Sequence, residues 1–264
     1  FCRQKTVDVR VRLTRPDCAR LFIGMTEEQV LAAVPLVYAL CGKAQRAAAA
    51  AALAAAANRP PPQVDDRALW QEHLYTCLWR LCLDWPTALA LPSAKKEATR
   101  SAFARWHRQA RTRQASSTAF ADATSGILRE VADGADGAPP PLQALRAAPL
   151  ARARGAWRAF TENAPYPLRA RGKNDIGVGR TQTARGMLAH GLRLRAGHVD
   201  AYCVHTPTDR NFADAARLTA QFDTLCAAPD NAETSPRQML ECAILALDPC
   251  VPYRVEWRER TRDA

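Results

Sequence analysis

The chain has 264 residues and a mass of 29.0 kDa, enough to bury a core of its own, and we expect a single domain over residues 1–264. Hydrophobic residues make up 48% and charged residues 24%, which excludes a chain that is disordered throughout. The net charge of +11 could suit a nucleic-acid-binding protein. However, the excess of arginine accompanies abundant alanine and proline, a combination that codon bias produces. Aromatic residues make up only 7%, so few side chains are available to stack on nucleic-acid bases.

The first predicted elements are a strand and a short helix. Residues 7–13 alternate apolar and charged side chains with a period of two, which predicts a half-buried strand. Thr26 begins a capping box with Gln29, so a helix should start there. Pro35 is expected to end it.

An alanine-rich run follows Gly42 and predicts the next helix. Cys41 should therefore lie at or just before a helix N-terminus. Free backbone N–H groups and the helix dipole favour a thiolate at that position, and the thiolate is the form that binds a metal.

The middle of the chain predicts helices joined by loops. A helix with apolar residues at helical spacing should run from Arg67 and stop at Pro86, followed by a basic helix over 94–114 and another over about 119–132. Two further short helical pieces should follow. Glycine, proline and charged residues predict loops at 58–66, 134–141 and 166–180.

The period changes to two from Gly186, which predicts two strands joined around residues 196–198. A helix over 211–225 follows. The last helix should begin with Ser235 as N-cap and run to about Leu247. The expected fold class is α+β, mostly helical, with a small antiparallel sheet.

That last helix leads into Asp248-Pro249, which should form a rigid, non-helical corner presenting Cys250. It is one of nine cysteines in the chain, at positions 2, 18, 41, 77, 82, 203, 226, 242 and 250. No pair has C-x-x-C spacing, which argues against zinc-ribbon and thioredoxin-like sites. We expect reduced thiols in a cytoplasm, with Cys77 and Cys82 buried as small apolar residues.

Neither a secretory signal nor a membrane span is apparent in the sequence. The longest apolar block, residues 47–57, is too short to cross a bilayer. The sequence contains no G-x-S-x-G and no Walker loop. A cysteine–histidine nucleophile, Cys250 or Cys203 with His205, stays formally open.

Four segments carry a resemblance when they are taken in order. They read LCGKAQ (40–45), TARGML (183–188), HTPTDRN (205–211) and LDPCVPY (247–253). Together they resemble the large subunit of nickel–iron hydrogenases, whose motifs are R-x-C-G-x-C-x-x-x-H, A-P-R-G, P-(S/T)-T-W-N and D-P-C-x-x-C. The resemblance implies a degenerate large-subunit-like core.

The departures from that family concern its metal ligands. Ala44 and Tyr253 stand where the family has its second cysteines, and Ala48 and Glu256 stand where it has histidines. Only two of four thiolates remain, so the resemblance implies neither a nickel site nor hydrogenase catalysis. We therefore expect a protein that is not an enzyme.

The chain is more similar to HupK/HoxV-type hydrogenase maturation proteins, degenerate relatives of the large subunit. This resemblance implies a scaffold that transiently holds iron carrying two cyanides and one carbonyl, with Cys41 and Cys250 as its ligands. Low-spin iron(II) with such ligands is soft, and thiolates are suitable donors. The implied partners are an iron-donating chaperone complex and the large-subunit precursor, with neither nucleic acid nor membrane.

The same resemblance assigns the surroundings of the iron. Arg185 and Thr208 would each donate a hydrogen bond to a cyanide, and Pro207 would help to wall in the carbonyl. Structural roles near the site are expected for Gly42, Gly186, Asn211 and Asp248.

Two alternatives remain open. The protein could be a non-metal interaction protein for hydrogenase assembly, in which both thiols pack as apolar residues or form a disulfide under oxidation. A basic nucleic-acid-binding protein is the other, and its affinity would fall steeply with salt.

Overall fold

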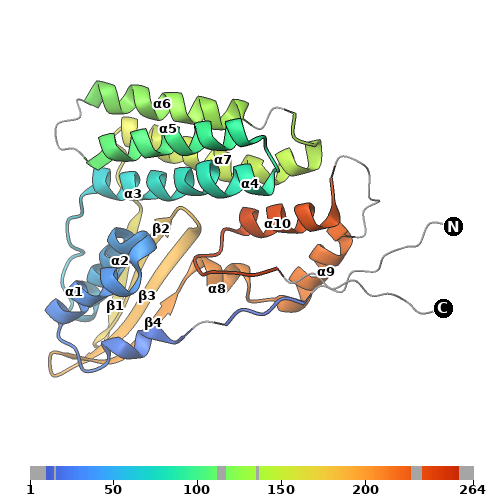
Figure 1. The fold of residues 1–264 in the computed structure, drawn as a ribbon. Helices are drawn as coiled ribbons and strands as arrows, with labels where there is room; N and C mark the ends of the chain where they lie inside the picture. The colour runs from blue at the N-terminus through green and yellow to red at the C-terminus, as the bar shows by residue number, and fades with distance from the viewer. Residues whose placement is uncertain (1–9, 15, 112–116, 135–136, 227–233, 256–264) are drawn as a thin grey trace, which may run out of the picture.

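The computed structural model describes residues 10–14, 16–111, 117–134, 137–226 and 234–255. Helices and one four-stranded antiparallel sheet make up the fold, which confirms the predicted class. A layer of helices, α3 to α7, lies beside a second unit in which α1 and α2 cover the sheet, and α8 to α10 close the other side (Figure 1).

The elements have these bounds. The α-helices are α1 (Glu27–Val37), α2 (Gly42–Ala56), α3 (Asp66–Trp79), α4 (Trp85–Ala88), α5 (Ser93–Arg111), α6 (Ser117–Asp133), α7 (Pro140–Thr161), α8 (Pro207–Asn211), α9 (Ala215–Cys226) and α10 (Pro236–Leu247). The strands are β1 (Leu168–Lys173), β2 (Ile176–Thr183), β3 (Gly186–Arg195) and β4 (His198–His205). Short 3-10 helices span Cys18–Phe22 and Ala39–Cys41, and a π-helical turn spans Arg80–Asp84.

The sheet is a meander in the order β1-β2-β3-β4. The predicted β3–β4 hairpin is confirmed, with Ala196 and Gly197 both at positive φ in its turn. The loop predicted over 166–180 is wrong, because β1 and β2 pair there through a turn at Asn174 and Asp175. Their φ values of 51° and 61° are those a tight hairpin turn needs, and asparagine and aspartate tolerate them.

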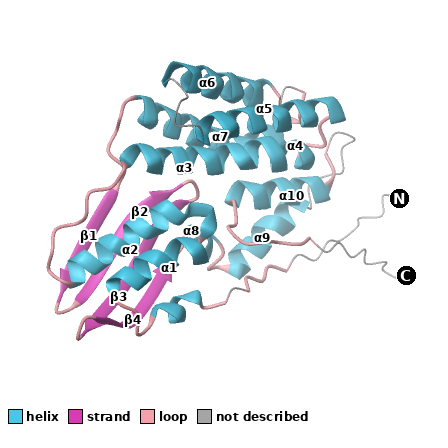
Figure 2. Ribbon diagram, turned by 60° about the vertical axis from the view of Figure 1, so that its left-hand side comes forward, coloured by secondary structure: helices cyan, strands magenta, loops and turns pink. Residues whose placement is uncertain are grey.

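Helix α2 lies directly on the sheet with almost nothing between the two backbones (Figure 2). A Cβ added at Gly172, Gly177 or Gly179 would come within 1.9–2.0 Å of a carbonyl oxygen of α2. Alanine on the helix and glycine on the strands therefore form a matched pair of surfaces. The alanine run favours a helix, and its small side chains also set how closely that helix approaches the sheet.

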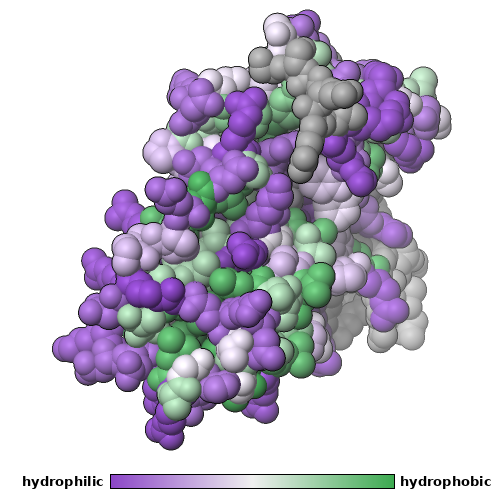
Figure 3. All heavy atoms as spheres, turned by 90° about the vertical axis from the view of Figure 1, so that its left-hand side faces the viewer, coloured by the Kyte–Doolittle hydropathy of each residue, from purple (hydrophilic) through white to green (hydrophobic). Residues whose placement is uncertain are grey.

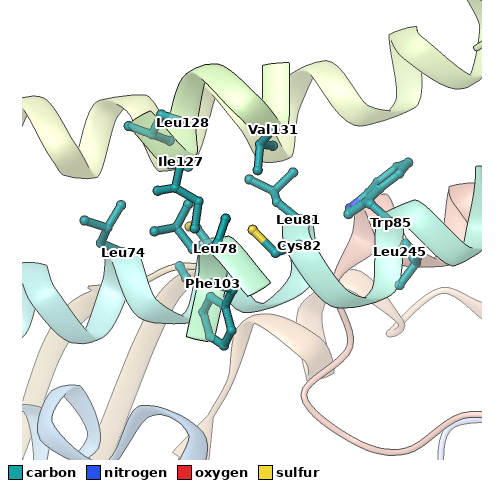
Figure 4. Packing of buried hydrophobic residues seen from close by; sticks show 14 of the residues in the cluster. Leu74, Leu78, Leu81, Cys82, Trp85, Phe103, Ile127, Leu128, Val131 and Leu245 are labelled. Carbon is teal, nitrogen blue, oxygen red and sulfur yellow. The ribbon is translucent and has the colours of Figure 1, made fainter. Parts of the chain in front are cut away.

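The largest apolar core lies within the helical layer. It joins α3, the π-helical turn and α4 to α5, α6, α7 and α10 (Figure 4). Helical structure continues past Pro86 to Ala88, so the predicted stop at Pro86 is wrong. The wider π-helical turn precedes Pro86, which occupies one of the first positions of α4, where proline is tolerated. Cys77 and Cys82 are buried in this core, as predicted.

The other differences from prediction are at helix ends. Pro35 lies inside the last turn of α1 and does not end it. One helix, α7, replaces the two short pieces and takes in Pro140 and Pro149, which shortens the predicted loop 134–141. Of the strand predicted over 7–13, residues 10–13 form no strand and 7–9 lie outside the described residues.

The capping predictions were accurate. Thr26 and Gln29 form both hydrogen bonds of the capping box at α1. The Ser235 side chain accepts a hydrogen bond from the Gln238 backbone N–H at the start of α10, and the predicted end at Leu247 is also observed.

The face that carries α1 and α2 mixes polar and apolar side chains, and apolar groups gather on part of it (Figure 3). Leu36 of α1 is one of the large apolar residues that are exposed, at 81%. Across the described ranges, no helix combines the length and apolar character that crossing a membrane requires.

Candidate functional site

Four segments that are far apart in the sequence meet at one end of the sheet. They are the N-terminus of α2, the β2–β3 turn, the β4–α8 junction and the end of α10. Between them lies a pocket of about 190 Å³. Its lining is Pro16, Cys18, Val37, Tyr38, Ala39, Leu40, Cys41, Gln45, Thr183, Arg185, Thr206, Pro207, Cys250 and Val251.

Cys41 enters the pocket as the residue that precedes α2, as the sequence predicted. The exposed backbone N–H groups of that helix end are already satisfied, because Glu72 of α3 accepts hydrogen bonds from Lys43 N (2.7 Å) and Ala44 N (2.9 Å). Burial raises the pKa of Cys41 to about 11, and Glu72 and Cys250 add to this rise. The expected preference for thiolate is therefore wrong, since desolvation outweighs the helix end.

A buried polar chain reaches Cys41 from the sheet. Gln45 Nε2 donates to Cys41 Sγ at 3.4 Å, and Gln45 Oε1 lies 2.7 Å from His190 Nε2. His190 Nδ1 lies 2.8 Å from the hydroxyl of Tyr202. Burial lowers the pKa of His190 to about 3, so its imidazole is neutral. The sequence reasoning missed all three residues; the one available signal was a glutamine within an otherwise alanine-rich helix.

Cys250 is fixed by the β4–α8 junction. Thr208 Oγ1 donates to Cys250 Sγ at 3.1 Å and accepts from the Cys250 backbone N–H at 3.0 Å. Asn211 donates to the carbonyl oxygen of Leu247 at 3.2 Å, which ties α8 to the end of α10 and fits its predicted structural role. Thr208 is fully buried behind the sulfur and is not among the pocket-lining residues, so its hydroxyl hydrogen points at the thiol and not at a ligand.

The corner before Cys250 is held by charge. Asp248 adopts a left-handed conformation (φ 49°), and not the extended one expected before proline. Its Oδ1 lies 2.9 Å from Arg80 Nε and 3.3 Å from Arg185 Nε. Arg80, from the π-helical turn, also donates to the Pro249 carbonyl oxygen at 2.7 Å. Arg80 could not be identified from the sequence motifs, because it lies far from all of them in the chain.

Arg185 is the most unusual group in the pocket. Its side chain is 2% exposed, and it reaches the pocket from the β2–β3 turn. None of its three guanidinium nitrogens makes a hydrogen bond with the described part of the chain, and the contact with Asp248 is an ion pair only. A buried guanidinium without acceptors is costly, so this group is suited to receive one from a ligand.

Two glycines near the site occupy positions that suit glycine. Gly186 has φ 129°, a backbone conformation that other residues rarely adopt. A Cβ on Gly42 would lie 3.1 Å from Pro35. Both observations are in line with the structural roles predicted for these glycines.

The residues at the positions that depart from the hydrogenase motifs differ in their surroundings. Ala44 and Ala48 are buried between α2 and the sheet. Tyr253 is 42% exposed, and Glu256 lies outside the described residues. Pro207 lines the pocket as predicted. Among the described residues, no group of three or more metal-ligating side chains is preformed.

The arrangement gives no support to a cysteine–histidine nucleophile. His205 and Cys203 are both exposed at the end of β4. The hydrogen bonds described for Cys250 go to Thr208. A general base would have to lie within hydrogen-bond reach of the thiol.

Comparison with known proteins shows similarity in sequence to two curated proteins and similarity in fold to solved structures. No protein-family model matches the chain. The hydrogenase expression/formation protein HupK of Azotobacter vinelandii is 27% identical over 326 aligned positions, which take in 96% of this chain and 94% of that protein. The hydrogenase expression/formation protein HupV of Azotobacter chroococcum mcd 1 is 39% identical over 80 residues, which is 30% of this chain and 22% of that protein.

One solved structure with a similar fold is an NAD+-reducing nickel–iron hydrogenase in the H2-reduced state, with a TM-score of 0.57, 11% identity and 90% of each chain covered. At that identity the likeness concerns the fold alone. The resemblance predicted from the four segments, to HupK-type hydrogenase maturation proteins related to nickel–iron hydrogenases, is thus confirmed in sequence and in fold.

Proposed function

We propose that the protein is a maturation scaffold that transiently holds iron carrying two cyanides and one carbonyl, on Cys41 and Cys250, for transfer to the large subunit of a nickel–iron hydrogenase. Both relatives are named hydrogenase expression/formation proteins. The observation that carries the proposal is the pocket itself. It brings Cys41 and Cys250, from opposite ends of the chain, together with a third cysteine, Cys18. It also holds the buried guanidinium of Arg185, which has no hydrogen-bond acceptor among the described residues.

The size of the pocket supports a small cargo. A cavity of about 150 Å³ accommodates benzene, which has six heavy atoms, whereas drug-sized ligands occupy about 300–1,000 Å³. At about 190 Å³ the pocket suits the iron group, with seven heavy atoms, and is too small for a nucleotide or a larger cofactor.

The lining supports the same cargo chemically. Thiolates are good donors to soft low-spin iron(II). A cyanide nitrogen is a hydrogen-bond acceptor, which is what Arg185 lacks. Val37, Leu40 and Pro207 supply apolar surface for a carbonyl. Two protein thiolates, in place of the four that a nickel–iron pair needs, would leave the iron group removable, as a carrier requires.

The proposal is tested by infrared spectroscopy on protein co-produced, without oxygen, with the enzymes that make cyanide and carbonyl ligands. The wild type should show bands of iron-bound cyanide and carbonyl. Cys41→Ser and Cys250→Ser should each lose them, since either substitution removes one of the two proposed ligands.

The matched control is Cys203→Ser, which removes an exposed thiol on β4 and should retain the bands. A wild-type protein without bands, or variants that keep them, would refute the scaffold. In the first case, the non-metal interaction protein becomes the better description.

Binding through Cys41 should also depend on pH. Because the pKa of Cys41 is raised to about 11, the thiol is protonated at neutral pH and must lose its proton to bind a metal. The affinity for Cd²⁺, used as a thiophilic test ion, should rise by about tenfold per pH unit for this one thiol between pH 6 and 9. The measurement is a competition titration at each pH; an affinity independent of pH would show that Cys41 is not a ligand.

The proposed partners are the iron-donating chaperone complex and the large-subunit precursor. The proposal needs both, because the scaffold neither makes its cargo nor keeps it. Co-purification of the iron-loaded wild type with the precursor, weakened in Cys41→Ser and retained in Cys203→Ser, is the corresponding expectation.

A further inference from the structure

We propose that Tyr202, His190 and Gln45 form a one-directional hydrogen-bond chain that holds the Gln45 amide as a fixed donor to the sulfur of Cys41. All three are positioning residues, because they act on the ligand atom through one another. The consequence at the iron rests on the proposed function. The hydrogen-bond chain itself does not, because it consists of protein side chains alone.

The direction of the chain follows from the Gln45 amide. Its Nε2 donates to Cys41 Sγ at 3.4 Å, and its Oε1 faces His190 Nε2 at 2.7 Å. An amide oxygen can only accept, so His190 Nε2 carries the single proton of the neutral imidazole and Nδ1 is an acceptor. The hydroxyl of Tyr202, 2.8 Å from Nδ1, therefore donates to it.

The chain is held rigidly. His190 is fully buried and Gln45 is 3% exposed. Tyr38 packs edge-on against His190, with ring centroids 6.3 Å apart, and Tyr202 packs on Phe22 at 4.8 Å. The chain joins β4 and β3, which pair in the sheet, to α2, which packs against that sheet. Reversing it would turn the Gln45 oxygen toward Cys41 and remove the hydrogen bond that the Gln45 amide donates to the sulfur.

A donor aimed at sulfur favours the thiolate over the thiol. Burial is the largest influence on the pKa of Cys41 and raises it, whereas the Gln45 hydrogen bond acts in the opposite direction. Gln45 is uncharged, so its effect comes from the placement of its amide nitrogen 3.4 Å from the sulfur. Once iron is bound, the same hydrogen bond withdraws charge from the sulfur and weakens its donation to the metal.

The first test uses the full-length protein without iron. The rate at which iodoacetamide alkylates Cys41 is followed against pH by peptide mass spectrometry. Gln45→Leu should slow alkylation at pH 8 by about tenfold, since a hydrogen bond to a charged group contributes about one pKa unit or more. Gln45→Glu has nearly the same shape but no donor and adds negative charge, so it should slow alkylation further.

Tyr202→Phe is the conservative test of direction. It removes only the hydroxyl at the far end of the chain and should slow alkylation in the same direction but less than Gln45→Leu. The melting temperature of each variant and the alkylation rate of the exposed Cys203 report whether the fold is intact. Unchanged alkylation of Cys41 in folded Gln45→Leu and Tyr202→Phe would overturn the proposal.

The second test separates this proposal from the proposed function. In the iron-loaded protein, Gln45→Leu should move the carbonyl band to lower wavenumber, because a sulfur without its hydrogen bond donates more charge to iron. A changed alkylation rate together with no infrared bands in the wild type would keep the chain and refute the scaffold. Bands in the wild type with unchanged alkylation and an unmoved carbonyl band would refute the chain and keep the scaffold.

Discussion

Gly179→Ala is expected to lower the free energy of unfolding by about 3 kcal/mol, at the upper end for overpacked sites. The added Cβ would lie 2.0 Å from the carbonyl oxygen of Ala48, an atom of the helix backbone that no rotamer change can move. Relief would require α2 to move off the sheet. For a domain of this size, the melting temperature should fall by about 6–12 °C.

The matched control is the same substitution at Gly155, in the middle of α7. A Cβ there meets nothing within 4 Å, so only helix propensity counts. Gly155→Ala should stabilise the protein by up to about 1 kcal/mol. Equal effects at the two glycines, measured by urea unfolding, would contradict the close packing of α2 on β2.

Asp248→Asn is expected to cost about 3–5 kcal/mol of stability, the range for removing one partner of a buried ion pair. The Asp248 side chain is 7% exposed and lies between the buried guanidinium groups of Arg80 and Arg185. Asparagine keeps the shape and tolerates the left-handed backbone, so the change isolates the charge. Two positive charges would then face each other without their shared counter-ion.

The comparison is with Glu241→Gln, which breaks the ion pair with Arg237 on the surface of α10. That pair is 3.0 Å long, with side-chain exposures of 32% and 60%, and should contribute about 0–1 kcal/mol. Urea unfolding at low and high salt distinguishes the two, because salt screens the exposed pair far more than the buried one. A small effect of Asp248→Asn would mean that the Asp-Pro corner is held by packing.

Local signals in the sequence were reliable where one segment contains all the atoms involved. The capping box at Thr26, the N-cap at Ser235 and the hairpin turn at Ala196-Gly197 depend on neighbours within a few residues. The β1–β2 hairpin was missed because its inward positions are glycines, which remove the apolar alternation that predicts a strand. Those glycines allow the close approach of α2, a helix more than a hundred residues away in the chain.

The site divides in the same way. Motif order pointed to Cys41, Cys250, Arg185 and Pro207, and these four line one pocket. Thr208 was predicted to donate a hydrogen bond to a cyanide, but its hydroxyl donates to the sulfur of Cys250. The spacing of residues along the sequence cannot distinguish these two acceptors. The sequence motifs did not predict the remaining residues of the site, because these residues lie outside the recognised motifs or their partners do. They are Glu72, Arg80 and the Gln45–His190–Tyr202 chain.

The sequence by itself determined which residue types were available: two thiols on helix-terminal corners, an arginine in a tight turn, and an alanine run able to approach a sheet. Only the tertiary structure decided their chemical states. Burial keeps the Cys41 thiol protonated, Asp248 is shared by two arginines, and Arg185 is left without an acceptor. The physical reason is that desolvation and charge pairing depend on neighbours brought together by folding, and these neighbours come from segments that are far apart along the chain.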